Sequence, residues 1–105
     1  MLIHTETVAG FDIAFYALSE DISPKETFED WQEVVEKVNS SEWVYFCAKV
    51  TASKNGIELA DDYLGCCCYA SYEQFVLDGD YYADMIETVV NDAKQAISGL
   101  IDCKE

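Results

Sequence analysis

The dipeptide Asn55-Gly56 places the strongest constraint on what this chain can fold into. Both residues tolerate the positive φ angles of a tight hairpin turn, and the runs that flank them are rich in β-branched and aromatic residues. We therefore expect two antiparallel strands, at residues 42–52 and 57–69. Asp61-Asp62 and Gly65 indicate a bulge or bend within the second of them.

A second pair of strands is expected near the N-terminus, at residues 2–8 and 11–18, on either side of Gly10. Phe11, Ile13 and Phe15 alternate with more polar or smaller residues, which places all three on one face of a strand. That face is the predicted core face of the sheet.

A helix is predicted to begin after Ser23, because Pro24 suits the first helical position and Glu26 completes an S-x-x-E capping box. Its expected buried stripe consists of Phe28, Trp31, Val34, Val35 and Val38.

The last helical region is predicted to start at Ser71, with Gln74 at the capping-box position, and to break at residues 78–80. A final helix is then expected over residues 80–101. Its predicted buried stripe is Tyr82, Met85, Ile86, Val89, Ala93, Ile97 and Leu100.

These signals predict one α+β domain over residues 1–105, with an antiparallel sheet of about four strands and helices on one face. The expected order is β-β-α-β-β-α. Half of the residues are apolar and 13% are aromatic, which is enough for a folded core.

The charge of the chain limits its partners, since 21 Asp and Glu residues face six Lys and no Arg, for a net charge of −15. Nothing in such a chain can neutralise nucleic-acid phosphates, so direct binding of DNA or RNA is not expected. Anionic membranes are disfavoured for the same reason, and no run of residues is long and apolar enough to span a bilayer. The charge favours a basic partner.

An acidic stripe is the first candidate binding feature. On a helix, its five carboxylates would lie along one solvent-facing side at spacings of three, four, seven and ten residues: Glu26, Glu29, Asp30, Glu33 and Glu36. The stripe has two interpretations. It is either a plain solvated face, or an anionic surface that competes for a basic groove made for nucleic acid.

Further acidic residues lie at predicted turns and bends: Asp61, Asp62, Asp78 and Asp80. Residues 78–80 resemble part of a calcium loop, but the glycine and the bidentate glutamate that such a loop requires are missing. Asp80 is expected to cap the last helix, and the alternatives are a contact with a basic partner or a weak divalent-ion site.

The cysteines do not predict a metal site. Cys66, Cys67 and Cys68 are consecutive, whereas structural zinc needs two spaced pairs of ligands. Cys47 and Cys103 are isolated, so small packed strand residues are the simpler interpretation. Reduced thiols and the lack of a secretory signal indicate a cytosolic protein.

We do not expect an enzyme, a cofactor or a metal. His4 is the single histidine, the five glycines form no phosphate-binding loop, and no pattern singles out a catalytic carboxylate pair.

Aromatic residues offer a second candidate binding feature. Trp43 and Tyr45 should point away from the core face of their strand, and Tyr16, Tyr63 and Tyr69 could join them on one side of the sheet. Helices that cover only one face would leave these rings exposed, as at many protein interfaces. A homodimer would cover the same surface.

The acidic stripe from Glu26 to Glu36, the acidic turns and the segment from Trp43 to Tyr72 give the chain a resemblance to small phage and mobile-element inhibitors of host defence. Anti-CRISPR and anti-restriction proteins, several of which mimic nucleic acid, are the examples. The resemblance implies a non-catalytic protein in the host cytosol that blocks the basic nucleic-acid-binding surface of a defence complex. The alternative is a small acidic accessory or immunity-type protein that binds one cognate protein without mimicry.

Overall fold

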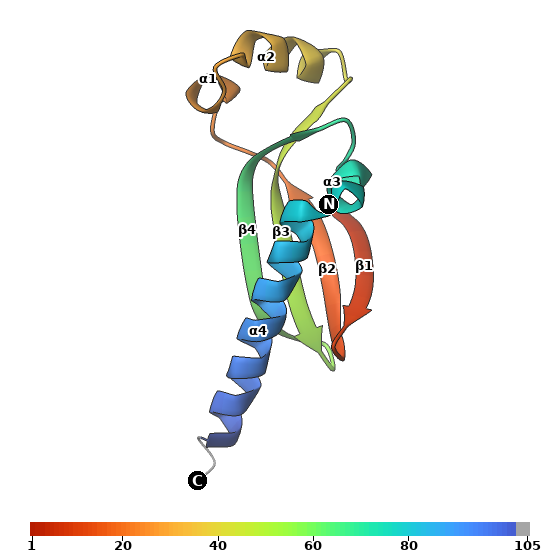
Figure 1. Cartoon of the computed structure of the whole chain (residues 1–105), viewed down its shortest axis with the longest axis vertical. Helices are drawn as coiled ribbons and strands as arrows, with labels where there is room; N and C mark the ends of the chain where they lie inside the picture. Colours follow the sequence, from red (N-terminus) through yellow and green to blue (C-terminus); the bar gives the residue numbers. More distant parts are fainter. Residues whose placement is uncertain (103–105) are drawn as a thin grey trace.

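The computed structural model of the chain describes residues 1–102. Its elements follow in the order β1 (Leu2–Val8), β2 (Phe11–Leu18), α1 (Pro24–Thr27), α2 (Trp31–Asn39), β3 (Val44–Lys54), β4 (Ile57–Tyr69), α3 (Tyr72–Asp78) and α4 (Asp80–Asp102) (Figure 1). The predicted α+β class is confirmed. The predicted order is confirmed only in outline, because each of the two expected helical regions contains two helices.

The sheet is a four-stranded antiparallel meander in which each strand pairs with its neighbours in the sequence, in the order β1-β2-β3-β4. Asn55 and Gly56 have φ angles of 53° and 79°, so the predicted hairpin between β3 and β4 is confirmed. Ala9 and Gly10 form the β1–β2 turn with φ angles of 53° and 85°. This turn places an alanine in the left-handed region, which is unusual for a residue with a Cβ atom.

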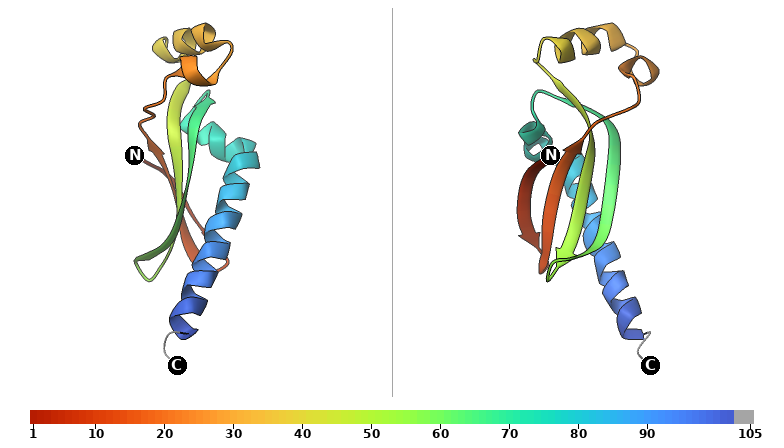
Figure 2. Two further views of the ribbon diagram at one scale, coloured as in Figure 1. Left: turned by 90° about the vertical axis from the view of Figure 1, so that its left-hand side faces the viewer. Right: turned by 180° about the vertical axis from the view of Figure 1, so that it is seen from behind.

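The core lies between one face of the sheet and α4 (Figure 2). The alternation predicted for β2 is confirmed, because Phe11, Ile13 and Phe15 are all buried there. Core residues of β3 and β4 complete this face: Phe46, Ala48, Val50, Ala52 and Cys67. Figure 2 shows that α4 covers this face of the sheet and that none of the helices within residues 1–102 covers the opposite face.

The predicted stripe of the last helix is confirmed where it can be compared. Tyr82, Met85, Val89 and Ala93 are buried, and Ile86 and Ile97 pack against them. Leu100 belongs to the predicted stripe, but its side chain lies outside the described residues. Val90 is also buried, which widens the apolar side of α4 beyond the predicted stripe.

The break between α3 and α4 is also confirmed. Gly79 ends α3 in the left-handed conformation, with φ at 80°, and its N–H donates to the carbonyl of Phe75. The Ser71 hydroxyl accepts from the Gln74 backbone N–H at 3.1 Å, which caps α3 as expected. Asp80 lies in the first turn of α4, where a carboxylate is stabilised by the helix dipole.

The first predicted helix differs most from expectation. It is divided by residues 28–30, and α1 and α2 lie beyond one end of the sheet instead of on its face (Figure 1). Phe28 has extended backbone angles of −113° and 138°, and its ring packs edge-on against Tyr45 with centroids 6.2 Å apart. This long-range contact turns the chain out of the helix.

A bulge at Cys66 changes which way the end of β4 faces. The pairing shifts between Ala48↔Leu64 and Phe46↔Cys67, and Cys66 has a φ angle of 59°. One extra residue reverses the alternation. Tyr69 therefore packs in the core against Phe75, with ring centroids 5.2 Å apart, and does not join Tyr63 on the uncovered face as predicted.

The molecule is elongated, with principal extents of 57 × 24 × 21 Å. The helices α1 and α2 lie at one end, and the last turns of α4 extend past the hairpins at the other (Figure 1). Within residues 1–102, none of the helices is both long and apolar enough to cross a lipid bilayer.

Candidate partner-binding surface

The segment 20–42, which we call the acidic lobe, contains α1 and α2 and stands apart from the core. It contains eight Asp and Glu residues against Lys25 and Lys37. Val34 is its only buried residue among those described. Because so little apolar surface is covered, the lobe is held mainly by its connections to the sheet.

The five predicted stripe residues all lie on the lobe and all are exposed, but they do not form one continuous helical stripe. Glu26 belongs to α1, Glu29 and Asp30 to the break, and Glu33 and Glu36 to α2. A single helix would have placed like charges three and four residues apart, which is unfavourable. The break removes that geometry except between Glu33 and Glu36, which remain three residues apart on α2, and it keeps all five carboxylates on the same lobe.

Little positive charge offsets these carboxylates. Lys37 forms an ion pair with Glu42 at 2.7 Å, and Lys25 lies over the Trp31 ring, 5.5 Å from its centroid. The hydrogen bond and the charge of Glu42 raise the pKa of Lys37. Within residues 1–102, the one further close contact between a carboxylate and a basic side chain joins Glu6 and His4, far from the lobe. The lobe therefore carries an uncompensated negative field.

The lobe is joined to the sheet through the Glu20 carboxylate, which accepts a hydrogen bond from the backbone N–H of Cys66. Partial burial acts to raise the pKa of Glu20, but hydrogen bonds from Cys66 and from the Asp21 backbone outweigh it, and the pKa is lowered. Gly65 leaves the space for this contact, because a Cβ atom there would lie 2.7 Å from Glu20 Oε1.

Two further contacts fasten the same junction. The Thr27 hydroxyl and the Cys66 thiol lie 3.3 Å apart, within hydrogen-bonding distance. The Tyr45 hydroxyl donates to the carbonyl of Ile22 at 2.6 Å, and its ring contacts Phe28. The predicted contact residue Tyr45 thus positions the lobe, and its hydroxyl has a partner within the chain.

The prediction that Trp43 belongs to a strand is wrong, because β3 begins at Val44. The backbone N–H groups of Glu42 and Trp43 both donate to the carbonyl of Lys37, at 2.9 and 3.2 Å. With Ser41 in the left-handed conformation, at a φ angle of 65°, these bonds close the C-terminus of α2. Trp43 is half-buried at the base of the lobe.

The remaining predicted carboxylates divide into two groups. Asp61 and Asp62 lie on β4, where Asp61 pairs with Thr51 and is exposed, while Asp62 pairs with the core residue Val50 and is half-buried. Asp78 and Asp80 are exposed at the corner between α3 and α4. The structure thus separates Asp61 and Asp62 from that corner.

Charges of the corner and of the lobe both act on the end of β4. Burial raises the pKa of Tyr69, and the charges of Asp78 and Asp80 raise it further. Burial likewise raises the pKa of its neighbour Cys68, with a further contribution from the charge of Asp30. Carboxylates from separate elements therefore act on two adjacent residues.

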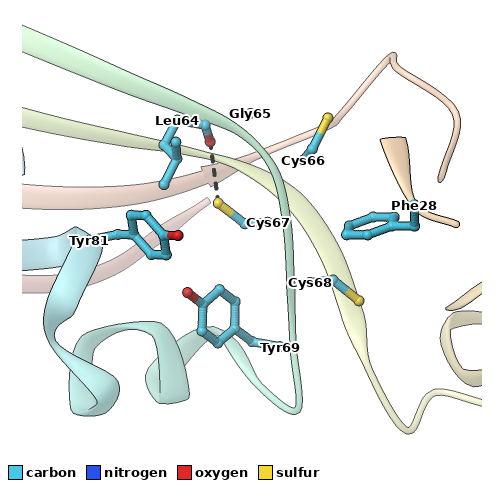
Figure 3. Close-up of a pocket in the computed structure, with 8 residues that line it drawn as sticks. All are labelled: Phe28, Leu64, Gly65, Cys66, Cys67, Cys68, Tyr69 and Tyr81. Atoms are coloured by element: carbon cyan, nitrogen blue, oxygen red, sulfur yellow. Dashed lines mark hydrogen bonds between the residues drawn. The ribbon is translucent and has the colours of Figure 1, made fainter. Parts of the chain in front are cut away.

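A pocket of about 260 Å³ lies at this place (Figure 3). Tyr69 and Tyr81 line it from the helix side of β4, and Phe28 lines it from the lobe side. Sequence analysis did not identify this pocket. The one local signal of the pocket in the sequence was Tyr81, an aromatic residue outside the predicted buried stripe of the last helix. In the structure this side chain is 57% exposed.

The cysteines at the pocket are free thiols. Burial raises the pKa of Cys67 to about 11, and its thiol donates to the carbonyl of Leu64 at 3.3 Å. Burial also raises the pKa of Cys47. Buried protonated thiols of this kind are inert. Among residues 1–102, no three His, Cys, Asp or Glu side chains are grouped so that they could hold a metal ion. Cys103 lies outside the described residues.

The single histidine takes part in a cluster that sequence analysis missed. His4 Nε2 lies 3.0 Å from Glu6 Oε2, which also accepts a hydrogen bond from the Tyr82 hydroxyl at 2.7 Å. Burial raises the pKa of Tyr82, and the bond to Glu6 raises it further. The cluster joins β1 to α4. Strand register could have placed Glu6 beside His4, but the contact with Tyr82 depends on how α4 packs.

Comparisons with known protein families, with curated proteins and with solved structures return no match to this chain.

Proposed function

We propose that this protein is a non-catalytic inhibitor that occupies a basic, nucleic-acid-binding surface of another protein or complex, as anti-CRISPR and anti-restriction proteins do. The observation that carries the proposal is the acidic lobe: eight carboxylates and two lysines on a segment that projects beyond the sheet. Such a projection can enter a groove that a flat acidic face could not reach.

Charge gives the lobe two effects on binding. Its field steers the protein toward a Lys- and Arg-lined groove and raises the association rate, an effect that falls steeply with salt. The five exposed carboxylates of residues 26–36 then take the places of backbone phosphates. Because exposed charge pairs contribute little each, most of the affinity must come from aromatic and apolar contacts nearby.

The test compares two triple variants that remove the same charge. Glu29→Gln, Asp30→Asn and Glu33→Gln neutralise the lobe, while Glu58→Gln, Glu87→Gln and Asp92→Asn neutralise exposed residues elsewhere. The tagged wild-type protein first captures its partner from a lysate of its native host, and affinities are then measured at several salt concentrations, with and without added DNA or RNA.

We expect the lobe variant to bind about 10-fold more weakly and with a flatter salt dependence, and nucleic acid to displace the wild type. The control variant should keep most of the affinity. Equal affinity and equal salt dependence for both variants would contradict the electrostatic mechanism. A partner that resists salt and ignores nucleic acid would instead identify an accessory or immunity-type protein.

A further inference from the structure

The pocket beside the cysteines combines aromatic walls with a negative rim. Its volume of about 260 Å³ is below the roughly 300–1,000 Å³ of typical small-molecule sites, so it suits a single long side chain. Figure 3 shows the Tyr69 and Tyr81 rings on one side of β4 and Phe28 on the other, so the pocket opens at the free edge of this strand.

The Tyr81 ring is available to a ligand. It is 57% exposed although it sits next to Tyr82, which is 5% exposed and belongs to the core. A tyrosine face attracts a cation through the ring quadrupole, most strongly where the site is partly shielded from water. Tyr69 provides a second ring with one side packed on Phe75.

Exposed carboxylates lie close to the pocket, since Asp78 and Asp80 stand at the corner that also holds Tyr81. Asp78 and Asp80 act on Tyr69, and Asp30 acts on Cys68. The N-terminus of α4 contributes about half a positive charge, which three carboxylates outweigh. An anion is therefore disfavoured, and so is a second copy of this chain, since two copies that each carry a net charge of −15 repel one another.

Two other occupants fit less well. A soft metal ion would need several converging ligands, and no three His, Cys, Asp or Glu side chains of residues 1–102 are grouped in that way. An added β-strand would need a regular edge, but the bulge at Cys66 interrupts β4 at this place.

We propose that this pocket receives an arginine side chain of the partner, with its aliphatic part against Leu64 and Tyr69 and its guanidinium over Tyr81 near Asp78 and Asp80. Arginine fits better than lysine because its planar guanidinium stacks on aromatic rings and can form bidentate hydrogen bonds with a carboxylate. The identity of the partner rests on the proposed function, but the chemistry of the pocket does not.

The experiment needs no partner. Acetyl-Gly-Arg-Gly-amide is titrated into the full-length ¹⁵N-labelled protein at about 0.15 M salt, which screens distant charges, and backbone NMR shifts are followed. The matched peptide contains citrulline, which has nearly the same shape as arginine but no charge. Two variants complete the design: Tyr81→Ser in the pocket and Tyr63→Ser on the uncovered face, where Tyr63 is 52% exposed.

We expect saturable shifts at residues 64–69 and 78–81, with the arginine peptide binding about 10-fold more tightly than the citrulline peptide. Tyr81→Ser should weaken binding by about fivefold, and Tyr63→Ser should leave it unchanged. Equal binding of the two peptides, or shifts spread over all acidic surfaces and unaffected by Tyr81→Ser, would overturn the proposal. Binding of arginine here would stand even if the partner proved unrelated to nucleic acid.

Discussion

The sheet with α4 and the acidic lobe are stabilised by different kinds of contact. In the first, large side chains such as Phe15, Phe46 and Val89 are at most 1% exposed and belong to one packed cluster. In the lobe, Val34 is the one buried residue among those described, and attachment depends on polar contacts around Cys66. The comparison teaches that a few hydrogen bonds hold the lobe in position, whereas buried apolar side chains hold the sheet and α4 together.

The largest expected effect separates the two regions. Phe15→Ala should lower the free energy of unfolding by about 3–5 kcal/mol, because its ring is fully buried against Phe46, Phe75 and Tyr82. Val34→Ala should remove about 1–2 kcal/mol, and from the lobe only.

Two probes can follow these variants in one urea titration. Both tryptophans, Trp31 and Trp43, lie in or beside the lobe, so their fluorescence reports its state. Far-UV circular dichroism reports mainly the sheet and α4. Phe15→Ala should shift both transitions and Val34→Ala only the fluorescence. Coincident transitions that shift together in both variants would show one cooperative unit and remove the distinction.

The second effect tests the attachment of the lobe. Gly65→Ala should displace Glu20 from Cys66 and cost about 1–2 kcal/mol of lobe stability, at the low end for a hydrogen bond to a charged group because Glu20 is only half-buried. Amide hydrogen exchange should accelerate in residues 20–42 and stay unchanged in β2 and β3.

Gly99→Ala is the matched control, since a Cβ atom there meets nothing within 4 Å and alanine favours the helix. In a Glu20→Ala background, Gly65→Ala should have almost no further effect. If the stability losses from the two substitutions add fully in the double variant, the contact between Glu20 and the bulge does not hold the lobe.

The smallest effect is a dependence on pH. The pKa of Glu20 is lowered in the folded protein below the ordinary value of 4.5, so its contribution is complete above about pH 4.5 and is lost as the pH falls through the folded-state pKa. Tryptophan fluorescence should report loosening of the lobe in that range. Glu20→Gln should abolish the change, and Glu36→Gln, at an exposed position of α2, should not. An identical acid transition in all three proteins would assign it to general charge effects.

Most of the sheet and α4 could be predicted because their signals are local. The alternation of Phe11, Ile13 and Phe15, the turn at Asn55-Gly56 and the break at Gly79 each depend on a few adjacent residues. Less of the candidate site could be predicted from local signals. Its carboxylates were found, but their grouping depends on tertiary contacts.

Two features show why the rest could not be predicted. The helix break depends on Phe28 meeting Tyr45, and the position of the lobe depends on Glu20 meeting Cys66, 46 residues away. The bulge at Cys66 then moves Tyr69 from the predicted outer face to the core. The glycine at position 65 indicated a bulge. The exact position of the bulge decides which rings remain exposed, and that position is set by the pairing of β4 with β3.

The narrow attachment of the lobe has a consequence for how such a protein can change. Substitutions on the outer surface of α1 and α2 touch almost none of the packed core, so they can alter the charge pattern without weakening the sheet. Under the proposed function, the charges that steer binding and the residues that build the core belong to separate sets. A lineage of this molecule could therefore change the charge pattern of the lobe while its sheet stays the same, as antibodies vary loops on a fixed scaffold.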